Sequence, residues 1–206
     1  SAKVVANLLT NAGANRIVTV DLHAGQIQGV FDMPVDNLFT TPLFSKFIKR
    51  KISSKKLICV SPDMGGVART RALATRLKAD LAIIDKRRPA PGKSQVMNII
   101  GDVENKTCII VDDIIDSGGT IVNAVDALKK KGAKEVYVFI THAVLSGEAA
   151  KKIKNSKIKK LIITDSIDNS NKIRNNNKIE VLSISSLMSE AIKRIANSNS
   201  VSDLFN

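Results

Sequence analysis

The chain has 206 residues and a mass of 22.2 kDa, enough to bury one full core, or one domain and part of another. Hydrophobic residues make up 44% of it, which excludes a disordered chain, and no apolar run approaches membrane-spanning length. The formal charge of +13 permits a polyanionic partner, yet aromatic residues are only 3% and Trp is absent, so nucleic-acid binding is disfavoured.

Apolar runs rich in Ile and Val alternate with segments of helical period along the chain. The strand runs are continuous rather than alternating, which indicates burial on both faces and predicts a mostly parallel sheet in an α/β fold. In such folds the ligand binds beyond the carboxyl ends of the strands. The expected elements in chain order are a helix at 2–12, a strand at 16–21, a helix at 41–51, a strand at 57–61, a helix at 66–79, strands at 81–85 and 107–111, a helix at 118–131, a strand at 135–140, a helix at 146–154, strands at 160–164 and 179–184, and a helix at 186–197.

Residues 11–25 and 130–147 share a helix end, a Gly-Ala turn, a strand and a His just past the strand. One interpretation is two related α/β domains with the first one truncated. The other is that any helix–turn–strand unit has this pattern.

Only two cysteines occur, Cys59 and Cys108, and both stand in apolar runs typical of strands. We interpret them as buried free thiols. This cysteine usage, without a signal-peptide pattern, predicts a cytoplasmic protein.

A glycine-rich loop follows the predicted strand at 107–111 in the stretch VDDIIDSGGTI. Backbone N–H groups at the start of a helix, beside the hydroxyls of Ser117 and Thr120, predict a cradle for a phosphate monoester. Gly118 and Gly119 allow the backbone to approach the oxyanions closely.

Three carboxylates precede that cradle, which is unexpected for a loop that binds an anion. Asp112 and Asp113 are expected at the strand end, where they can accept hydrogen bonds from vicinal hydroxyls or hold a divalent cation through water. Asp116 or Ser117 is expected to cap the helix. A ligand with a phosphate at one end and a diol at the other, such as a sugar phosphate, suits the whole loop; the alternative is a capped helix after an acidic strand end.

A second loop, CVSPDMGGVARTR, follows the strand at 57–61. Gly65 and Gly66 open a helix that carries Arg69 and Arg71, which favours an anion, and Asp63 is placed to meet a metal ion. An ordinary turn is the alternative.

A third loop follows the strand at 81–85, where Lys86, Arg87 and Arg88 precede a segment rich in Pro and Gly. A mobile flap bearing cations suits charge stabilisation on a transferring phosphoryl group; a solvated hairpin is the alternative. The GKS at 92–94 is not a Walker motif, because the first Gly would fall at Arg87 and the QVMNII that follows reads as a strand. A fourth loop places His23 just past the first strand, as a ligand or as a structural residue.

These stretches together resemble the ribose-phosphate pyrophosphokinase family. VDDIIDSGGT is similar to the loop that this family shares with the phosphoribosyltransferases. DLHAGQIQGVFDMPVDNL, SPDMGGVARTRALA, and DKRRP followed by VMNIIGDV resemble the pyrophosphokinases specifically, and the resemblance extends to the final NSVSDLF.

The resemblance implies a phosphoribosyltransferase-like (type I) α/β fold. Its two similar domains would be represented by residues 1–40, the end of a truncated first domain, and by 41–186, a complete second domain. Residues 187–206 would pack back on the first. The family has an additional N-terminal region that grips ATP, so we expect a fragment that lacks activity alone.

The implied reaction transfers the diphosphoryl group of ATP to the 1-hydroxyl of ribose 5-phosphate, with Mg²⁺ as cofactor. Phosphate or ADP are the implied regulators, and a homo-oligomer (hexamers in the family) the implied assembly. Ser117 replaces the motif's usual Thr and keeps the hydroxyl. The implied roles are ribose 5-phosphate binding for Asp112, Asp113, Asp116, Ser117, Gly118, Gly119 and Thr120, catalysis for Lys86 and Arg88 (Arg88 also reaching substrate phosphate), magnesium placement for His23 and Asp63, and regulation for Ser200, Ser202 and Phe205.

Three other functions remain at this point. A phosphoribosyltransferase acting on a nucleobase would use the same 111–120 loop, although DLHAGQIQG and DKRRP speak against it. A non-catalytic regulatory relative would lack the flap cations or the acids, and both are present. A nucleic-acid binder would show affinity that depends steeply on salt.

Overall fold

The computed structural model of the chain describes residues 1–54, 56–87 and 96–205. Arg88, expected to be a flap cation, lies outside the described residues. The chain divides into two compact units, unit 1 (Ser1–Thr40 with Ser185–Asn206) and unit 2 (Thr41–Ile184). Within the described ranges, no helix is both long and apolar enough to cross a membrane.

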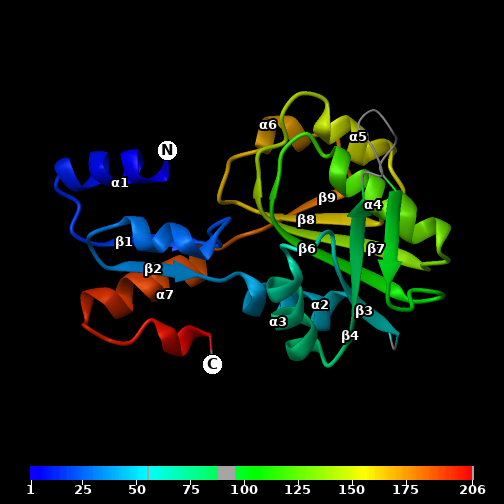
Figure 1. Cartoon of the computed structure of the whole chain (residues 1–206), viewed down its shortest axis with the longest axis horizontal. Coiled ribbons are helices and arrows are strands. Elements are labelled where there is room, and N and C mark those ends of the chain that lie inside the picture. Colours follow the sequence, from blue (N-terminus) through cyan, green and yellow to red (C-terminus); the bar gives the residue numbers. More distant parts are fainter. Residues whose placement is uncertain (55, 88–95, 206) are drawn as a thin grey trace. The chain divides into compact units, whose positions relative to one another are not determined.

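Unit 2 is built on a seven-stranded sheet in the order β5-β4-β3-β6-β7-β8-β9 (Figure 1). The pairing of β4 with β5 is antiparallel and every other pairing in this sheet is parallel. This arrangement confirms the predicted α/β class with a mostly parallel sheet. The strands are β3 (Leu57–Ser61), β4 (Asp80–Arg87), β5 (Val96–Ile100), β6 (Thr107–Ile115), β7 (Glu135–Ala143), β8 (Lys160–Thr164) and β9 (Ile179–Leu182).

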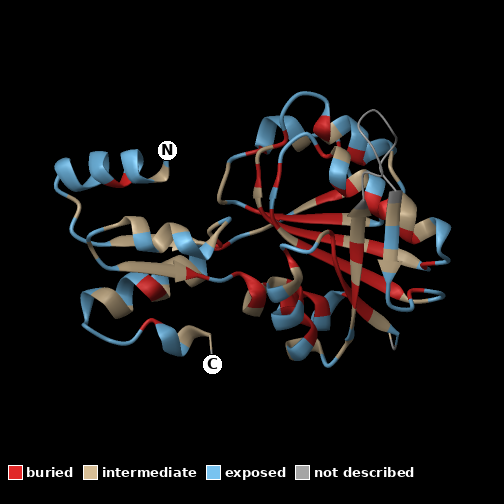
Figure 2. Cartoon of the chain, viewed as in Figure 1, coloured by how far each residue is buried: buried red, intermediate tan, exposed pale blue. Residues whose placement is uncertain are grey.

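Helices cover both faces of this sheet, because side chains at successive strand positions point to opposite sides. Cys59, Ile109 and Phe139 pack with α2 (Thr41–Lys51) and α3 (Val67–Leu77). Their neighbours Ile58 and Cys108 pack on the other face with α4 (Gly119–Lys130) and α5 (Ala149–Asn155). Figure 2 shows the resulting buried layer along the strands of unit 2.

The order of the strands reverses between β3 and β6. The chain leaves β3 through α3 toward β4, and it leaves β6 through α4 toward β7 on the opposite face. Adjacent parallel strands whose connections diverge in this way leave a crevice at their carboxyl ends, where α/β proteins bind ligands. The loops after β3 and β6 are therefore the ones that can share a ligand.

Two strands run further than the sequence predicts. β6 continues to Ile115 rather than stopping at 111, because its pairing with β7 extends to Ile115 and Ala143. β4 continues to Arg87 rather than stopping at 85, because Lys86 pairs with Met97 of the antiparallel β5. Asp112 and Asp113 thus belong to a strand, and so does Lys86, which we had assigned to a flap.

Unit 1 contains a two-stranded parallel sheet of β1 (Ile17–Val20) and β2 (Val35–Leu38). β2 was not predicted; it is only four residues long, and two of them, Asp36 and Asn37, have low strand propensity. Leu38 is buried with Ala191 and Val201. The helical elements of unit 1 are α1 (Ala2–Asn11), η1 (Gly25–Val30), α7 (Ser185–Ala196) and η2 (Ser202–Leu204), and α6 (Ser170–Ile173) completes unit 2.

Both cysteines are free and buried in unit 2, as predicted. Burial raises the pKa of each thiol to about 12, so neither is a thiolate near neutral pH.

Candidate active site

Two adjacent carboxylates near the end of β6 share one arginine of α3. The Nη1 atom of Arg69 donates to Oδ1 of Asp112 at 3.1 Å and to Oδ1 of Asp113 at 2.9 Å. The backbone N–H of Asp113 also donates to Oδ1 of Asp112, at 3.0 Å. This acid cluster, Arg69 with Asp112 and Asp113, joins the helix that follows β3 to the end of β6.

The two acids differ in their access to a ligand. The side chain of Asp113 is 5% exposed and that of Asp112 is 18% exposed. Burial raises the pKa of Asp112 to about 7, and the neighbouring Asp113 adds to the rise while Arg69 opposes it. Of the pair, Asp112 is therefore the more available to a ligand, whereas Asp113 is packed against the arginine.

The glycine-rich loop follows three residues later and begins α4. Gly118 is the N-cap, with a φ of 76°, and no side chain caps this helix. The expected cap by Asp116 or Ser117 is therefore wrong: a left-handed residue makes the turn, and a glycine adopts that conformation without steric cost. Asp116, Ser117 and Thr120 are exposed around the helix start.

A lysine from α5 also reaches this loop. Lys152 Nζ donates to the carbonyl oxygen of Ser117 at 3.3 Å. The loop therefore combines a helix N-terminus, whose first N–H groups lack intrahelical acceptors, with a nearby ammonium group. Both features attract an anion.

The loop after β3 presents Asp63 at the start of α3. Its Oδ1 accepts a hydrogen bond from the backbone N–H of Gly66 at 3.0 Å, and Ser61 Oγ donates to its carbonyl oxygen at 2.6 Å. Lys86 Nζ lies 3.6 Å from its Oδ2. The carboxylate that follows β3 and the ammonium group of a residue on the neighbouring β4 thus lie close together.

The residues expected to place magnesium lie in different units. His23 is exposed in unit 1, and Asp63 belongs to unit 2. In the part of the chain that the structure describes, no three His, Cys, Asp or Glu side chains gather as a metal site.

The residues expected to be regulatory lie near the end of unit 1. Arg194 Nη1 donates to the carbonyl oxygen of Ser200 at 2.8 Å and reaches Oδ2 of Asp203 at 3.4 Å. The ring of Phe205 packs edge-on against Phe39, and Ser202 begins η2. A cavity of about 280 Å³ borders this segment, lined by Glu190, Lys193, Arg194, Asn197, Asn199, Ser200 and Asp203.

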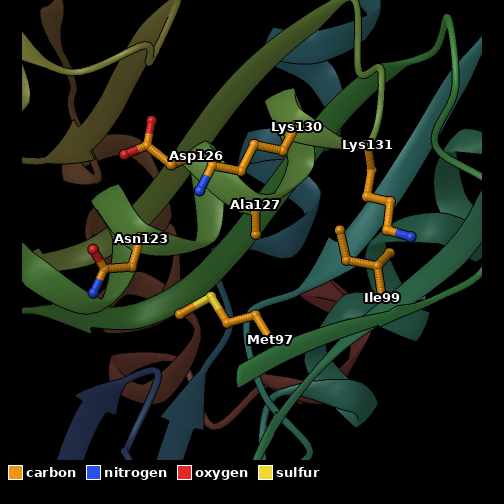
Figure 3. A pocket seen from close by; sticks show the side chains of 7 residues that line it. All are labelled: Met97, Ile99, Asn123, Asp126, Ala127, Lys130 and Lys131. Atoms are coloured by element: carbon orange, nitrogen blue, oxygen red, sulfur yellow. The ribbon is translucent and has the colours of Figure 1, made fainter. Parts of the chain in front are cut away.

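A larger cavity of about 510 Å³ lies between β5 and α4 (Figure 3). Met97 and Ile99 line it from the strand, and charged side chains of α4 form the other wall. None of the described residues that we expected to bind substrate is part of its lining, which is made of Met97, Ile99, Asn123, Asp126, Ala127, Lys130 and Lys131.

Comparison with known proteins decides the family. Residues 86–206 match the model of the phosphoribosyl synthetase-associated domain. The chain belongs to the ribose-phosphate pyrophosphokinase family. Over 205 residues it is 59% identical to the ribose-phosphate pyrophosphokinase of Bradyrhizobium diazoefficiens, covering 100% of this chain and 65% of that protein. It is 57% identical over 206 residues to that of Hyphomonas neptunium, covering 100% of this chain and 66% of the relative.

A solved member of the family has the same fold. The phosphoribosylpyrophosphate synthetase of Mycobacterium smegmatis superimposes with a TM-score of 0.88 at 38% identity, over 96% of this chain and 64% of that one. The chain thus spans just under two thirds of the length of these pyrophosphokinases. The resemblance that the sequence motifs indicated is confirmed, as is the fold class.

Sequence reasoning missed two residues of this site. Arg69 was noted on its helix but not connected with the acids, because it is 43 residues from Asp112 in sequence and nothing in the local pattern pairs them. Lys152 was not singled out; it lies among several lysines of α5, so its composition carried no signal.

Proposed function

We propose that the full-length protein transfers the diphosphoryl group of ATP to the 1-hydroxyl of ribose 5-phosphate, giving phosphoribosyl diphosphate and AMP. The described residues of this chain would supply the ribose 5-phosphate site and one catalytic cation, Lys86. Family membership supports the reaction. The observation that carries the site is the acid cluster beside the N-terminus of α4, because it offers carboxylates to a diol and backbone N–H groups to a phosphate within one crevice.

In this proposal the 5-phosphate binds at the start of α4. Gly118 and Gly119 allow the close backbone approach, and the exposed hydroxyls of Ser117 and Thr120 donate further hydrogen bonds. Asp112 and Asp116 receive the ribose hydroxyls, since both are accessible. Asp113 would hold Asp112 in place through the arginine that both acids contact.

The chemistry of the residues present fits Mg²⁺ as a cofactor. Magnesium keeps several waters and is held by one or two carboxylates plus substrate phosphates, so it does not need a dedicated cage of protein ligands. Asp63, whose side chain is 46% exposed beside Lys86, is such a carboxylate. His23 stays a proposed second contributor on the resemblance alone. The ion would neutralise charge on the polyphosphate of ATP.

The transfer step asks the protein for alignment and charge stabilisation. The 1-hydroxyl oxygen bonds to the β-phosphorus of ATP and loses its proton to water, while the bond from that phosphorus to the bridging oxygen of AMP breaks. Negative charge develops on the phosphoryl oxygens and on departing AMP. Lys86, near the end of β4, would meet that charge, and Arg88 is proposed as the second cation from the resemblance.

The same reasoning extends to regulation and assembly. We propose phosphate or ADP as regulators acting near Ser200, Ser202 and Phe205, where Arg194 provides a cation. We also propose a homo-oligomer, as in the family, and a cytoplasmic location, which the two buried free cysteines support.

The deciding experiment follows AMP release from ATP in the full-length protein, with ribose 5-phosphate and Mg²⁺ and without any nucleobase. We expect AMP and phosphoribosyl diphosphate in equal amounts. A phosphoribosyltransferase would instead consume phosphoribosyl diphosphate only when a base is added. Absence of AMP under these conditions would overturn the proposal.

A further inference from the structure

We infer that Arg69 is a positioning residue that clamps the two carboxylates of β6 and aims Asp112 at the ribose hydroxyls. This inference rests on the proposed function, which it deepens by adding a residue of α3 to the acceptor site. Arg69 acts through the acids and is not itself assigned a contact with substrate.

A single nitrogen atom of Arg69 contacts both acids. One nitrogen, Nη1 of Arg69, reaches Oδ1 of both acids, at 3.1 Å for Asp112 and 2.9 Å for Asp113. Oδ1 of Asp112 also accepts the backbone N–H of Asp113 at 3.0 Å. Two donors on one carboxylate oxygen fix the side-chain torsions of Asp112, so its orientation is set before a sugar arrives.

Charge explains why a cation is needed at this point. Two carboxylates on successive residues of a strand, one of them 5% exposed, repel each other and lose hydration. The guanidinium is itself only 19% exposed, so solvent screens this contact less than an ordinary surface pair. Arg69 therefore offsets both costs at once.

Arg69 also links the two strands at the switch point. It is carried by α3, which follows β3, whereas the acids are on β6, which lies beside β3 in the sheet. The acids are consequently held relative to the loop that presents Asp63 as well as relative to each other. This link matters for the reaction, because a small displacement of the bound acceptor lowers the rate of transfer. The diol must therefore be held in a fixed position relative to the phosphate site.

The first test measures kinetics in the full-length protein with Arg69→Gln, Arg69→Lys and, as the control, Arg50→Gln at an exposed arginine in the last turn of α2. We expect Arg69→Gln to raise KM for ribose 5-phosphate about 10- to 100-fold, the loss expected when hydrogen bonds to a charged group are misplaced, with KM for ATP unchanged. Arg69→Lys should recover part of the loss, because it keeps the charge without the planar fork. Arg50→Gln should match the unmutated protein.

The second test does not depend on the substrate. Arg69→Gln should lower Tm by about 5–10 °C, since it removes the cation that the two acids share. In an Asp113→Asn background, Arg69→Gln should lower Tm by less than half as much. The repulsion between the two carboxylates, which Arg69 offsets, is absent from that background.

Each outcome decides something different. A KM for ribose 5-phosphate within twofold of the unmutated value in Arg69→Gln overturns the inference, as does an equal rise in KM for ATP. Equal Tm losses with and without Asp113→Asn also overturn it. If the unmutated protein neither binds nor uses ribose 5-phosphate, the proposed function fails, and the Tm comparison still decides whether Arg69 clamps the acids.

Discussion

The ammonium group of Lys86 lies 3.6 Å from the carboxylate of Asp63, across the gap between β4 and the loop that follows β3. Asp63 is half exposed, so the attraction is screened and weak. A phosphate group that enters the crevice can replace Asp63 as the partner of this lysine. In the proposed reaction, the weak contact with Asp63 thus holds Lys86 beside the crevice and is readily exchanged for a contact with substrate phosphate.

Replacement of Lys86 should affect the transfer step more than binding of the acceptor. If the ammonium stabilises the transition state selectively by about 3 kcal/mol, Lys86→Ala lowers kcat roughly a hundredfold. The affinity for ribose 5-phosphate should change little, and steady-state kinetics with the full-length protein would measure both. Lys151→Ala, at an exposed lysine of α5, is the matched control. Equal losses in kcat and in acceptor affinity would count against a transition-state role.

Replacement of Asp63 should change the response to magnesium. Asp63→Asn removes the charge that we propose to meet the ion but keeps an oxygen that can accept the N–H of Gly66. We expect activity to require roughly tenfold more Mg²⁺, equivalent to about 1.4 kcal/mol. A magnesium titration at fixed ATP measures this. An unchanged requirement would remove Asp63 from the proposed metal site.

The raised pKa of Asp112 predicts how stability depends on pH. Folding lifts this pKa from an ordinary 3.8 to about 7, so between these values the folded chain binds more protons than the unfolded chain. The free energy of unfolding must then fall as pH rises through this window, and the contribution is lost above about 7. Urea unfolding should show that the free energy of unfolding falls between pH 5 and pH 8. In Asp112→Asn this fall should be smaller by about 1–2 kcal/mol than in the unmutated chain.

The control for that experiment is Asp126→Asn on α4, which should keep the pH dependence of the unmutated chain. A pH dependence that survives intact in Asp112→Asn would mean that another group is responsible.

The turn at Gly118 predicts a cost for any side chain there. Its φ of 76° is a left-handed conformation, which costs other residues about 1–2 kcal/mol. The added methyl group of Gly118→Ala would lie 3.7 Å from Cβ of Ala149, an ordinary contact, so the cost comes from the backbone. We expect Tm to fall by about 2–8 °C and ribose 5-phosphate to bind more weakly. Gly29→Ala, with open space around the new methyl group, should change neither.

The sequence predicted those parts of unit 2 that local pattern determines. Continuous apolar runs identified the buried strands, and Gly118–Gly119 marked the start of α4. What it predicted poorly depends on distant partners. The acids after Val111 have low strand propensity, yet pairing with β7 keeps Asp112 and Asp113 in β6. Similarly, Lys86 reads as a loop residue until β5 is known to pair with β4.

The contact between Arg69 and the acids could not be predicted from local sequence pattern, because it also depends on partners that are distant in sequence. A motif reports residues a few positions apart, whereas this contact is set by the order of strands in the sheet. The sequence did indicate that the loops after the strands at 57–61 and 107–111 carry chemistry. The sequence could not show that these two strands, β3 and β6, are neighbours in the sheet. Because they are neighbours, the loops that follow them can form one site.

The pairing of β3 with β6 also bears on how the protein is made. A growing chain that has completed β3 must still produce β4 and β5 before β6 exists, so the two halves of the crevice meet only by closing a long loop. Contacts of such sequence separation form late and slowly in folding. The proposed site for a sugar phosphate is therefore incomplete until β6 and the start of α4 have been synthesised, and that metabolite could not assist the earlier steps of folding.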